Sequence, residues 1–260
     1  MNQNAVKGVR RDDLIQFLDT LLQTKEIQDN SWNGLQIEGK ETVKKIAFSV
    51  DASYESFQAA IAEEADFLIV HHGLFWKGQN PSLKAWMKKR VDSLYAHHVS
   101  LYASHLPLDC HPVVGNNIQL LHMVNARPKE GFGWYEGRTI GWVGSFSSPT
   151  TISQIEKDLQ HGLKQPLLSI LPFGPAEIKS IAVCSGGANL SFFYEALTSQ
   201  ADLFLTGESR DIYAIAKDAG IHVIFAGHHL SETVGLNALA KEIKKEFPVE
   251  TVDCHIPTRL

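Results

Sequence analysis

The sequence lacks long apolar runs. In its 260 residues the longest ones, such as residues 65–70, are interrupted by charges like that of Asp66. A membrane-spanning helix needs about 20 apolar residues, so no transmembrane segment is predicted. Residues 1–13 lack the apolar core of a secretory signal, and the three cysteines, at positions 110, 184 and 254, form no C-x-x-C motif. We therefore expect a cytoplasmic protein with no membrane partner.

The sequence also lacks an excess of basic residues. It contains 24 Lys and Arg and 29 Asp and Glu, which gives a net charge of -5. Proteins that bind nucleic acids generally need a basic surface to neutralise phosphates, so a DNA or RNA partner is disfavoured. Neither the G-x-S-x-G motif of serine hydrolases nor the phosphate loop G-x-x-x-x-G-K-[ST] occurs. The chemistry must therefore come from another set of side chains.

Side chains with metal-ligand chemistry recur where short apolar runs end. They are His71 and His72 in IVHHGLFW, Asp109 in SHLPLDCHPVVGNN, and His228 and Glu232 in AGHHLSE. Ligands of α/β proteins gather outside the carboxyl ends of strands, and each motif follows such an apolar run. Neighbouring residues leave the chain in different directions, so the histidine pair fits two ions better than one. The mixed nitrogen and oxygen ligands predict a centre of two divalent transition-metal ions.

Two further histidines adjoin these candidate ligands, His105 and His229. An imidazole titrates near neutral pH and transfers protons in both directions, so each is a candidate catalytic acid or base. The alternative for each is a structural role in which the side chain orients a metal ligand. The sequence leaves both interpretations open.

Two segments of the chain resemble each other, residues 44–73 and residues 178–208. Both read as a strand, a turn, an amphipathic helix and a second strand that opens with Ala-Asp. Downstream, residues 99–109 match residues 221–232. A generic βαβ pattern is the alternative, but the shared Ala-Asp favours an internal duplication. We therefore predict an α/β fold with two similar halves and the metal site between them.

The changeover between the halves is expected in residues 124–150, which contain Pro128 and five glycines. This gives a first α/β half of residues 1–125 and a second of residues 126–260, with the option that the C-terminal segment packs back on the first half.

The first half is expected to begin with an amphipathic helix. Asp12 or Asp13 would cap this helix at its N-terminus. Its apolar stripe would consist of Leu14, Phe17, Leu18 and Leu21.

The motifs HHGxFWKG and HLPLDxHPxxGNN resemble those of the bacterial GTP cyclohydrolase I type 2 homologues, also called the Nif-three-like family. The resemblance extends over nearly the whole chain, from DNSWNGLQIEG near residue 30 to ADLFLTGE and GHHLSE. It implies a dinuclear metal centre whose ligands are His71, His72, Asp109, His228 and Glu232. It also implies two similar α/β domains and a homohexameric ring with the metals facing an inner cavity.

The ligand set and the resemblance together predict a dinuclear metal-dependent hydrolase of the GTP cyclohydrolase type. Two ions of Fe, Zn, Mn, Ni or Co would activate water for attack on the substrate. The substrate would be a small molecule, with a purine nucleotide ring or a phosphoester as candidates. The alternative is a non-catalytic metal-binding ring or scaffold protein.

Overall fold

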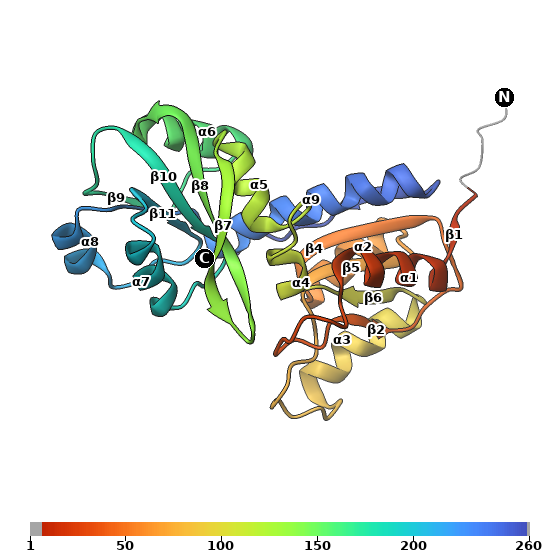
Figure 1. Cartoon of the computed structure of the whole chain (residues 1–260). Coiled ribbons are helices and arrows are strands. Elements are labelled where there is room, and N and C mark those ends of the chain that lie inside the picture. Colours follow the sequence, from red (N-terminus) through yellow and green to blue (C-terminus); the bar gives the residue numbers. More distant parts are fainter. Residues whose placement is uncertain (1–6, 259–260) are drawn as a thin grey trace. The chain divides into compact units, whose positions relative to one another are not determined.

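The computed structural model describes residues 7–258, so the first six residues of the N-terminal segment discussed above lie outside the described residues. The chain divides into two compact units, each with its own sheet (Figure 1). Among the described residues, the first unit contains residues 7–108 and 236–256, and the second contains residues 109–235 and 257–258. The change of unit thus lies ahead of the position near residue 125 that the sequence pattern predicts.

The first unit is built on a five-stranded sheet with the order β13-β4-β5-β6-β2. In that order the strands are Glu250–Asp253, Lys45–Asp51, Phe67–His72, Ser100–Ala103 and Gly34–Ile37. Strand β2 is antiparallel to β6, and the other neighbours are parallel. The helices are α1 (Arg11–Leu22), α2 (Tyr54–Ala62) and α3 (Ala85–Ala96), with the short α4 (Leu106–Asp109) after β6. Strands β1 (Val9–Arg10) and β3 (Thr42–Val43) form a separate antiparallel pair.

The start of α1 differs from the sequence prediction. The N-cap residue is Arg10, and it makes no side-chain cap hydrogen bond. The guanidinium of Arg11, the first helical residue, contacts Glu38 and the carbonyl of Gly39, each at 3.0 Å. The two aspartates expected at the cap lie in the first helical turn instead, where they face the positive end of the helix dipole. The buried apolar residues of the helix are Leu14, Leu18 and Leu22.

The core of the first unit forms around β5, because parallel strands with helices packed against the sheet are buried on both faces. Residues 67–70 of this strand are fully buried. Helix α2 packs Phe57 and Ala60 into the same core. The N-terminus of α2 is fixed by reciprocal hydrogen bonds between Ser53 and Ser56. The carboxyl end of β5 is therefore held by a rigid scaffold.

The second unit contains a six-stranded sheet with the order β7-β8-β10-β11-β12-β9. In that order the strands are Arg127–Tyr135, Arg138–Thr150, Ile178–Cys184, Leu203–Thr206, His222–Phe225 and Ser169–Pro172. Strands β10, β11 and β12 are parallel, and the other pairs are antiparallel. The helices are α5 (Asn116–Met123), α6 (Ile152–Leu163), α7 (Leu190–Thr198) and α8 (Tyr213–Ala219). Helix α9 (His228–Glu246) begins in this unit, and its residues from Leu236 on belong to the first unit.

The two units share one order of elements, which is β4-α2-β5-α3-β6 in the first and β10-α7-β11-α8-β12 in the second. In both, the three strands are parallel neighbours. This order is what an internal duplication would produce, and duplication remains our prediction. The mixed α/β class predicted from the sequence is confirmed. None of the helices within residues 7–258 has the length and apolar character to cross a membrane.

Candidate metal centre

The predicted histidine pair occupies the end of a central strand of the first unit. His71 and His72 are the last two residues of β5, within the strand rather than after it. His71 is fully buried, whereas His72 is half-buried. Their ring centroids lie 4.7 Å apart. Both imidazoles are thus presented at the carboxyl edge of the sheet.

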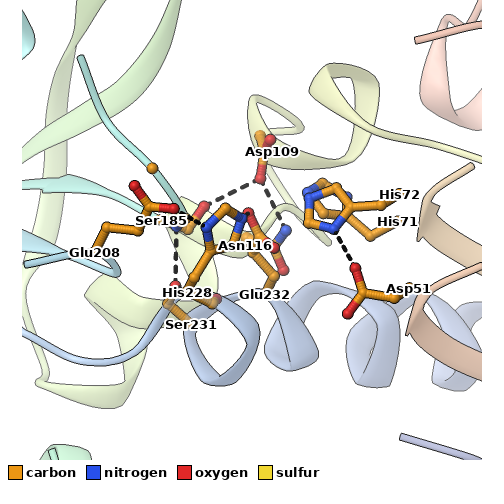
Figure 2. A network of polar contacts seen from close by, with 12 residues as sticks. Asp51, His71, His72, Asp109, Asn116, Ser185, Glu208, His228, Ser231 and Glu232 are labelled. Carbon is orange, nitrogen blue, oxygen red and sulfur yellow. Dashed lines mark hydrogen bonds and ion pairs between the residues drawn. The ribbon is translucent and has the colours of Figure 1, made fainter. Parts of the chain in front are cut away.

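Each histidine of the pair has its Nδ1 atom fixed by an oxygen. Nδ1 of His71 lies 2.9 Å from the carbonyl oxygen of Ser104. Nδ1 of His72 lies 2.8 Å from Oδ1 of Asp51 (Figure 2). Asp51 ends β4 and pairs with His72 in the ladder between β4 and β5. A carbonyl or carboxylate oxygen only accepts hydrogen bonds, so Nδ1 carries the proton in both rings. The Nε2 lone pair is therefore the one that each ring offers to a metal ion.

His105 joins this pair to form what we call the histidine cluster, which consists of His71, His72 and His105. Its ring centroid lies 5.1 Å from that of His71 and 5.6 Å from that of His72. Each of the three rings offers one nitrogen, and these nitrogens lie within 4.8 Å of one another. His105 follows β6, so neighbouring parallel strands bring the cluster to one sheet edge.

The second unit contains another group of predicted ligands, which we call the carboxylate cluster: Asp109, His228 and Glu232. Asp109 is the last residue of α4 and is buried. Its Oδ1 accepts hydrogen bonds from Nδ2 of Asn116 at 2.8 Å and from Oγ of Ser185 at 3.0 Å (Figure 2). One of its carboxylate oxygens lies within 4.8 Å of one from Glu232. Two buried carboxylates this close favour a cation between them.

His228 is the first residue of α9, and Glu232 lies about one helical turn after it. The helix brings the two side chains together, and Nε2 of His228 lies 3.3 Å from Oε1 of Glu232. Nδ1 of His228 lies 2.7 Å from Oε1 of Glu208. Burial alone would lower the pKa of His228, but the hydrogen bonds and charges of Glu232 and Glu208 raise it to about 9. The carboxylates thus stabilise a positive charge at the imidazole, which a divalent ion at Nε2 would also supply.

The loop after β10 approaches the carboxylate cluster most closely at a glycine, Gly186. Gly186 has φ +60°, and its backbone N–H donates to Oγ of Ser231 at 2.9 Å. A Cβ atom at this position would lie 2.1 Å from Oε1 of Glu232 and 3.2 Å from Nε2 of His228. The space beside these donor atoms therefore exists only because residue 186 has no side chain.

The donor sets fit divalent transition metals. All three predicted histidine ligands have Nδ1 held by a carbonyl or carboxylate oxygen, which is the usual arrangement around metal-bound imidazoles. The sequence reasoning missed the side chains that orient the ligands, which are Asp51, Asn116, Ser185 and Glu208. A signal was present for two of them, because Asp51 ends an apolar run and Glu208 follows the Ala-Asp strand of the second repeat.

His229 occupies a different environment from the ligands beside it. It is the second residue of α9 and only 6% exposed. Among residues 7–258, it belongs to none of the groups whose donor atoms lie within 4.8 Å of one another. His105, by contrast, has a side chain that is 21% exposed. The two predicted proton-transfer residues therefore differ in access to solvent.

Comparisons with known proteins agree with this description. The family model described as Duf34/NIF3 (NGG1p interacting factor 3) matches residues 9–258. A Pyrococcus horikoshii protein named GTP cyclohydrolase 1 type 2 homolog is 43% identical over 251 residues, which are 96% of this chain and 99% of that protein. A protein of the same name from Salmonella typhimurium is 35% identical over 250 residues, 96% of this chain and 99% of that protein.

The fold is similar to that of solved structures as well. The crystal structure of TTHA1606 from Thermus thermophilus has a TM-score of 0.84 and 34% sequence identity, and the match covers 97% of this chain and all of that one.

Proposed function

The chain belongs to the Duf34/NIF3 family, and from this premise we propose that it is a hydrolase that uses two divalent transition-metal ions per chain. The proposed ligands are His71, His72, Asp109, His228 and Glu232. The observation that carries the proposal is the fixed orientation of the three imidazoles, whose Nδ1 atoms all contact an oxygen acceptor. The Nε2 atoms are thereby oriented for metal binding, and the Nε2 proton of His228 would be released when an ion binds.

In the proposed hydrolysis, the metal ions and the histidine side chains have different roles. The ions, when bound, would make a water nucleophilic at neutral pH and polarise the group under attack. His105 is our first candidate for proton transfer, because it is partly exposed and adjoins the two histidine ligands. His229 is the second candidate, and its burial favours a role in orienting neighbouring groups instead. In both cases an imidazole nitrogen would take a proton from the attacking water and return it to the leaving atom.

The proposed substrate is a small molecule with a purine nucleotide ring, in line with the name given to the relatives, or a phosphoester. A homohexameric ring is proposed from the same family resemblance. Light scattering tests the assembly, since a monomer at all micromolar concentrations would contradict it.

Metal analysis tests the centre itself. We expect about two ions per chain in the native protein, and loss of at least one ion in His228→Ala and in Glu232→Ala, because alanine offers no donor. His229→Ala is the matched control and should keep the metal. If His229→Ala empties the site while His228→Ala leaves it full, the ligand assignment is wrong by one residue. A metal content near zero after expression in metal-supplemented medium would refute the centre as a whole.

An activity screen tests the reaction class. We expect turnover of a nucleotide or phosphoester substrate that chelators abolish and that Mn, Zn, Fe or Co restores. A protein that keeps its two ions but shows no turnover with any restored metal would support the alternative, a metal-binding scaffold. These two results separate the presence of the centre from its use in catalysis.

A further inference from the structure

We propose that Asp29 and His105 form a proton-transfer dyad in which Asp29 holds the His105 imidazole in one tautomer, with a proton on Nδ1 and a free lone pair on Nε2. Asp29 is then a positioning residue, and His105 is the group that exchanges the proton. This inference rests on the proposed hydrolase function, because it assigns the proton transfer of that reaction.

The contact between the two residues is direct. Nδ1 of His105 lies 3.0 Å from Oδ1 and 3.1 Å from Oδ2 of Asp29. The Asp29 side chain is 2% exposed and that of His105 is 21% exposed. A carboxylate only accepts hydrogen bonds, so the shared proton belongs to Nδ1. Within residues 7–258, Nε2 of His105 makes no hydrogen bond, and it is therefore available to another group.

Asp29 is held in place by further donors. Its Oδ1 accepts from the backbone N–H of Ser31 at 3.0 Å, and its Oδ2 accepts from Nδ2 of Asn33 at 2.8 Å and from the N–H of Leu106 at 3.0 Å. Burial alone would raise the pKa of Asp29, but the hydrogen bond and charge of His105, with the bonds from Asn33 and Ser31, lower it to about 2. The buried carboxylate is thus ionised and oriented, as a partner of a proton-transferring imidazole must be.

The backbone of His105 is fixed by the same segment. Its N–H donates to Oδ1 of Asn33 at 2.8 Å. The segment that carries Asp29 is itself tied to the chain after β5, because Trp32 N–H donates to Phe75 at 3.0 Å and Lys77 N–H donates to Asn30 at 2.7 Å. Residues far apart in sequence thus hold the dyad beside the end of β5.

The dyad lies next to the proposed ligands of the first unit. The His105 ring is within 5.1 Å of the His71 ring and 5.6 Å of the His72 ring, centroid to centroid. The ring of Trp76 packs edge-on against His105, with centroids 5.0 Å apart. A water held by metal at those histidines would lie within reach of Nε2 of His105, directly or through one further water.

The proton balance of the step is simple. Nε2 of His105 accepts the proton that the attacking water loses, and the resulting imidazolium is stabilised by the negative charge of Asp29. The same proton then passes from Nε2 to the leaving atom. The dyad returns to its starting state and no further reactant is needed.

The first test measures the tautomer of His105. Solid-state nitrogen NMR of zinc-loaded protein with ¹⁵N-labelled histidine separates protonated from bare ring nitrogens, and the His105→Gln variant identifies the signals of residue 105. We expect the Nδ1–H form in the wild type. The Nε2–H form in the wild type would overturn the dyad without any reference to activity.

The second test is Asp29→Asn. The substitution replaces one carboxylate oxygen by an NH₂ group, which can only donate hydrogen bonds. Every hydrogen-bond partner of Asp29 is itself a donor, so this NH₂ faces another donor. His105 removes the conflict by moving its proton from Nδ1 to Nε2, because Nδ1 then accepts the hydrogen bond. We expect the tautomer to shift, kcat to fall by about 10²–10⁴-fold and the metal count to stay unchanged. Asp19→Asn is the control: this residue accepts from the Tyr102 hydroxyl at 2.8 Å in the same unit, and the change should move neither the tautomer nor kcat.

The double variant decides whether Asp29 acts through His105. In the His105→Gln background, Asp29→Asn should cause little further loss of kcat. Independent losses that multiply would contradict the dyad. The hydrolase proposal would be refuted if the wild type has the Nδ1–H form of His105 but turns over no substrate. The dyad alone would be refuted if turnover is unchanged in Asp29→Asn and in His105→Gln.

Discussion

Nδ1 of His228 lies 2.7 Å from Oε1 of Glu208, and this contact has a counterpart in the other unit, where Nδ1 of His72 lies 2.8 Å from Oδ1 of Asp51. In each case a carboxylate fixes the ring orientation and makes Nε2 a more basic ligand. The carboxylates come from chain segments that contribute no proposed ligand themselves.

We therefore predict that Glu208→Gln and Asp51→Asn each weaken metal binding by about 10–100-fold while both proteins remain folded. The amide can still accept a hydrogen bond from Nδ1, but it no longer supplies the negative charge. Competition with a chromophoric chelator measures the affinity. Glu177→Gln removes the same charge from an exposed position of the second unit and should leave the affinity unchanged. Equal affinities in all three variants would show that these carboxylates do not tune the ligands.

Gly186→Ala should remove metal without unfolding the protein. The added Cβ would lie 2.1 Å from Oε1 of Glu232, so the carboxylate or the loop must move. Gly137→Ala is the matched control, because that residue also has positive φ, at +89°, and a Cβ there meets nothing within 4 Å. Both variants carry the backbone strain of about 1 kcal/mol, and only Gly186→Ala should lose bound metal in elemental analysis. Full metal content in Gly186→Ala would place the ion elsewhere.

Asp66→Ala and Asp202→Ala should destabilise the protein to a similar degree. Oδ2 of Asp66 accepts from the backbone N–H groups of Lys44 and Lys45 at 2.8 and 3.3 Å. Oδ2 of Asp202 accepts from those of Lys179 and Ser180 at 2.8 and 3.0 Å. Each substitution leaves such donors without their acceptor and should cost about 1–3 kcal/mol of unfolding free energy.

Urea unfolding measures the loss of unfolding free energy in both variants. The control is Asp218→Ala, at an exposed position of α8, which should change the unfolding free energy by less than about 0.5 kcal/mol. A loss in only one of the two aspartate variants would argue against equivalent roles in a duplicated unit.

Asp29 should make the stability depend on pH in the acid range. Its pKa is lowered from 3.8 to about 2 in the folded protein, so folding favours the ionised form. This contribution, of about 2 kcal/mol, is complete above the unfolded pKa and is lost as the pH falls from about 4 to about 2. The difference in unfolding free energy between the wild type and Asp29→Asn should therefore shrink over this window. A difference that stays constant from pH 5 to pH 2 would contradict the lowered pKa.

The sequence predicted the elements that local chemistry controls. The apolar run before His71 indicated a buried strand, and β5 contains it. The four-residue spacing of His228 and Glu232 corresponds to about one helical turn, and α9 brings Nε2 of His228 to 3.3 Å from Oε1 of Glu232. The predicted start of α1 was wrong. Two adjacent aspartates suggest an N-cap, but the helix begins at Arg11, whose guanidinium contacts the distant Glu38 and Gly39.

Sequence by itself determined the α/β class and the candidate ligands, since both follow from residue type and short-range periodicity along the chain. The tertiary structure alone decided which groups orient those ligands and the candidate base. Asp51 lies 21 positions from His72, Glu208 lies 20 from His228, and Asp29 lies 76 from His105. A hydrogen bond requires two atoms within about 3 Å at a suitable angle, and only the folded chain sets that geometry for residues so far apart.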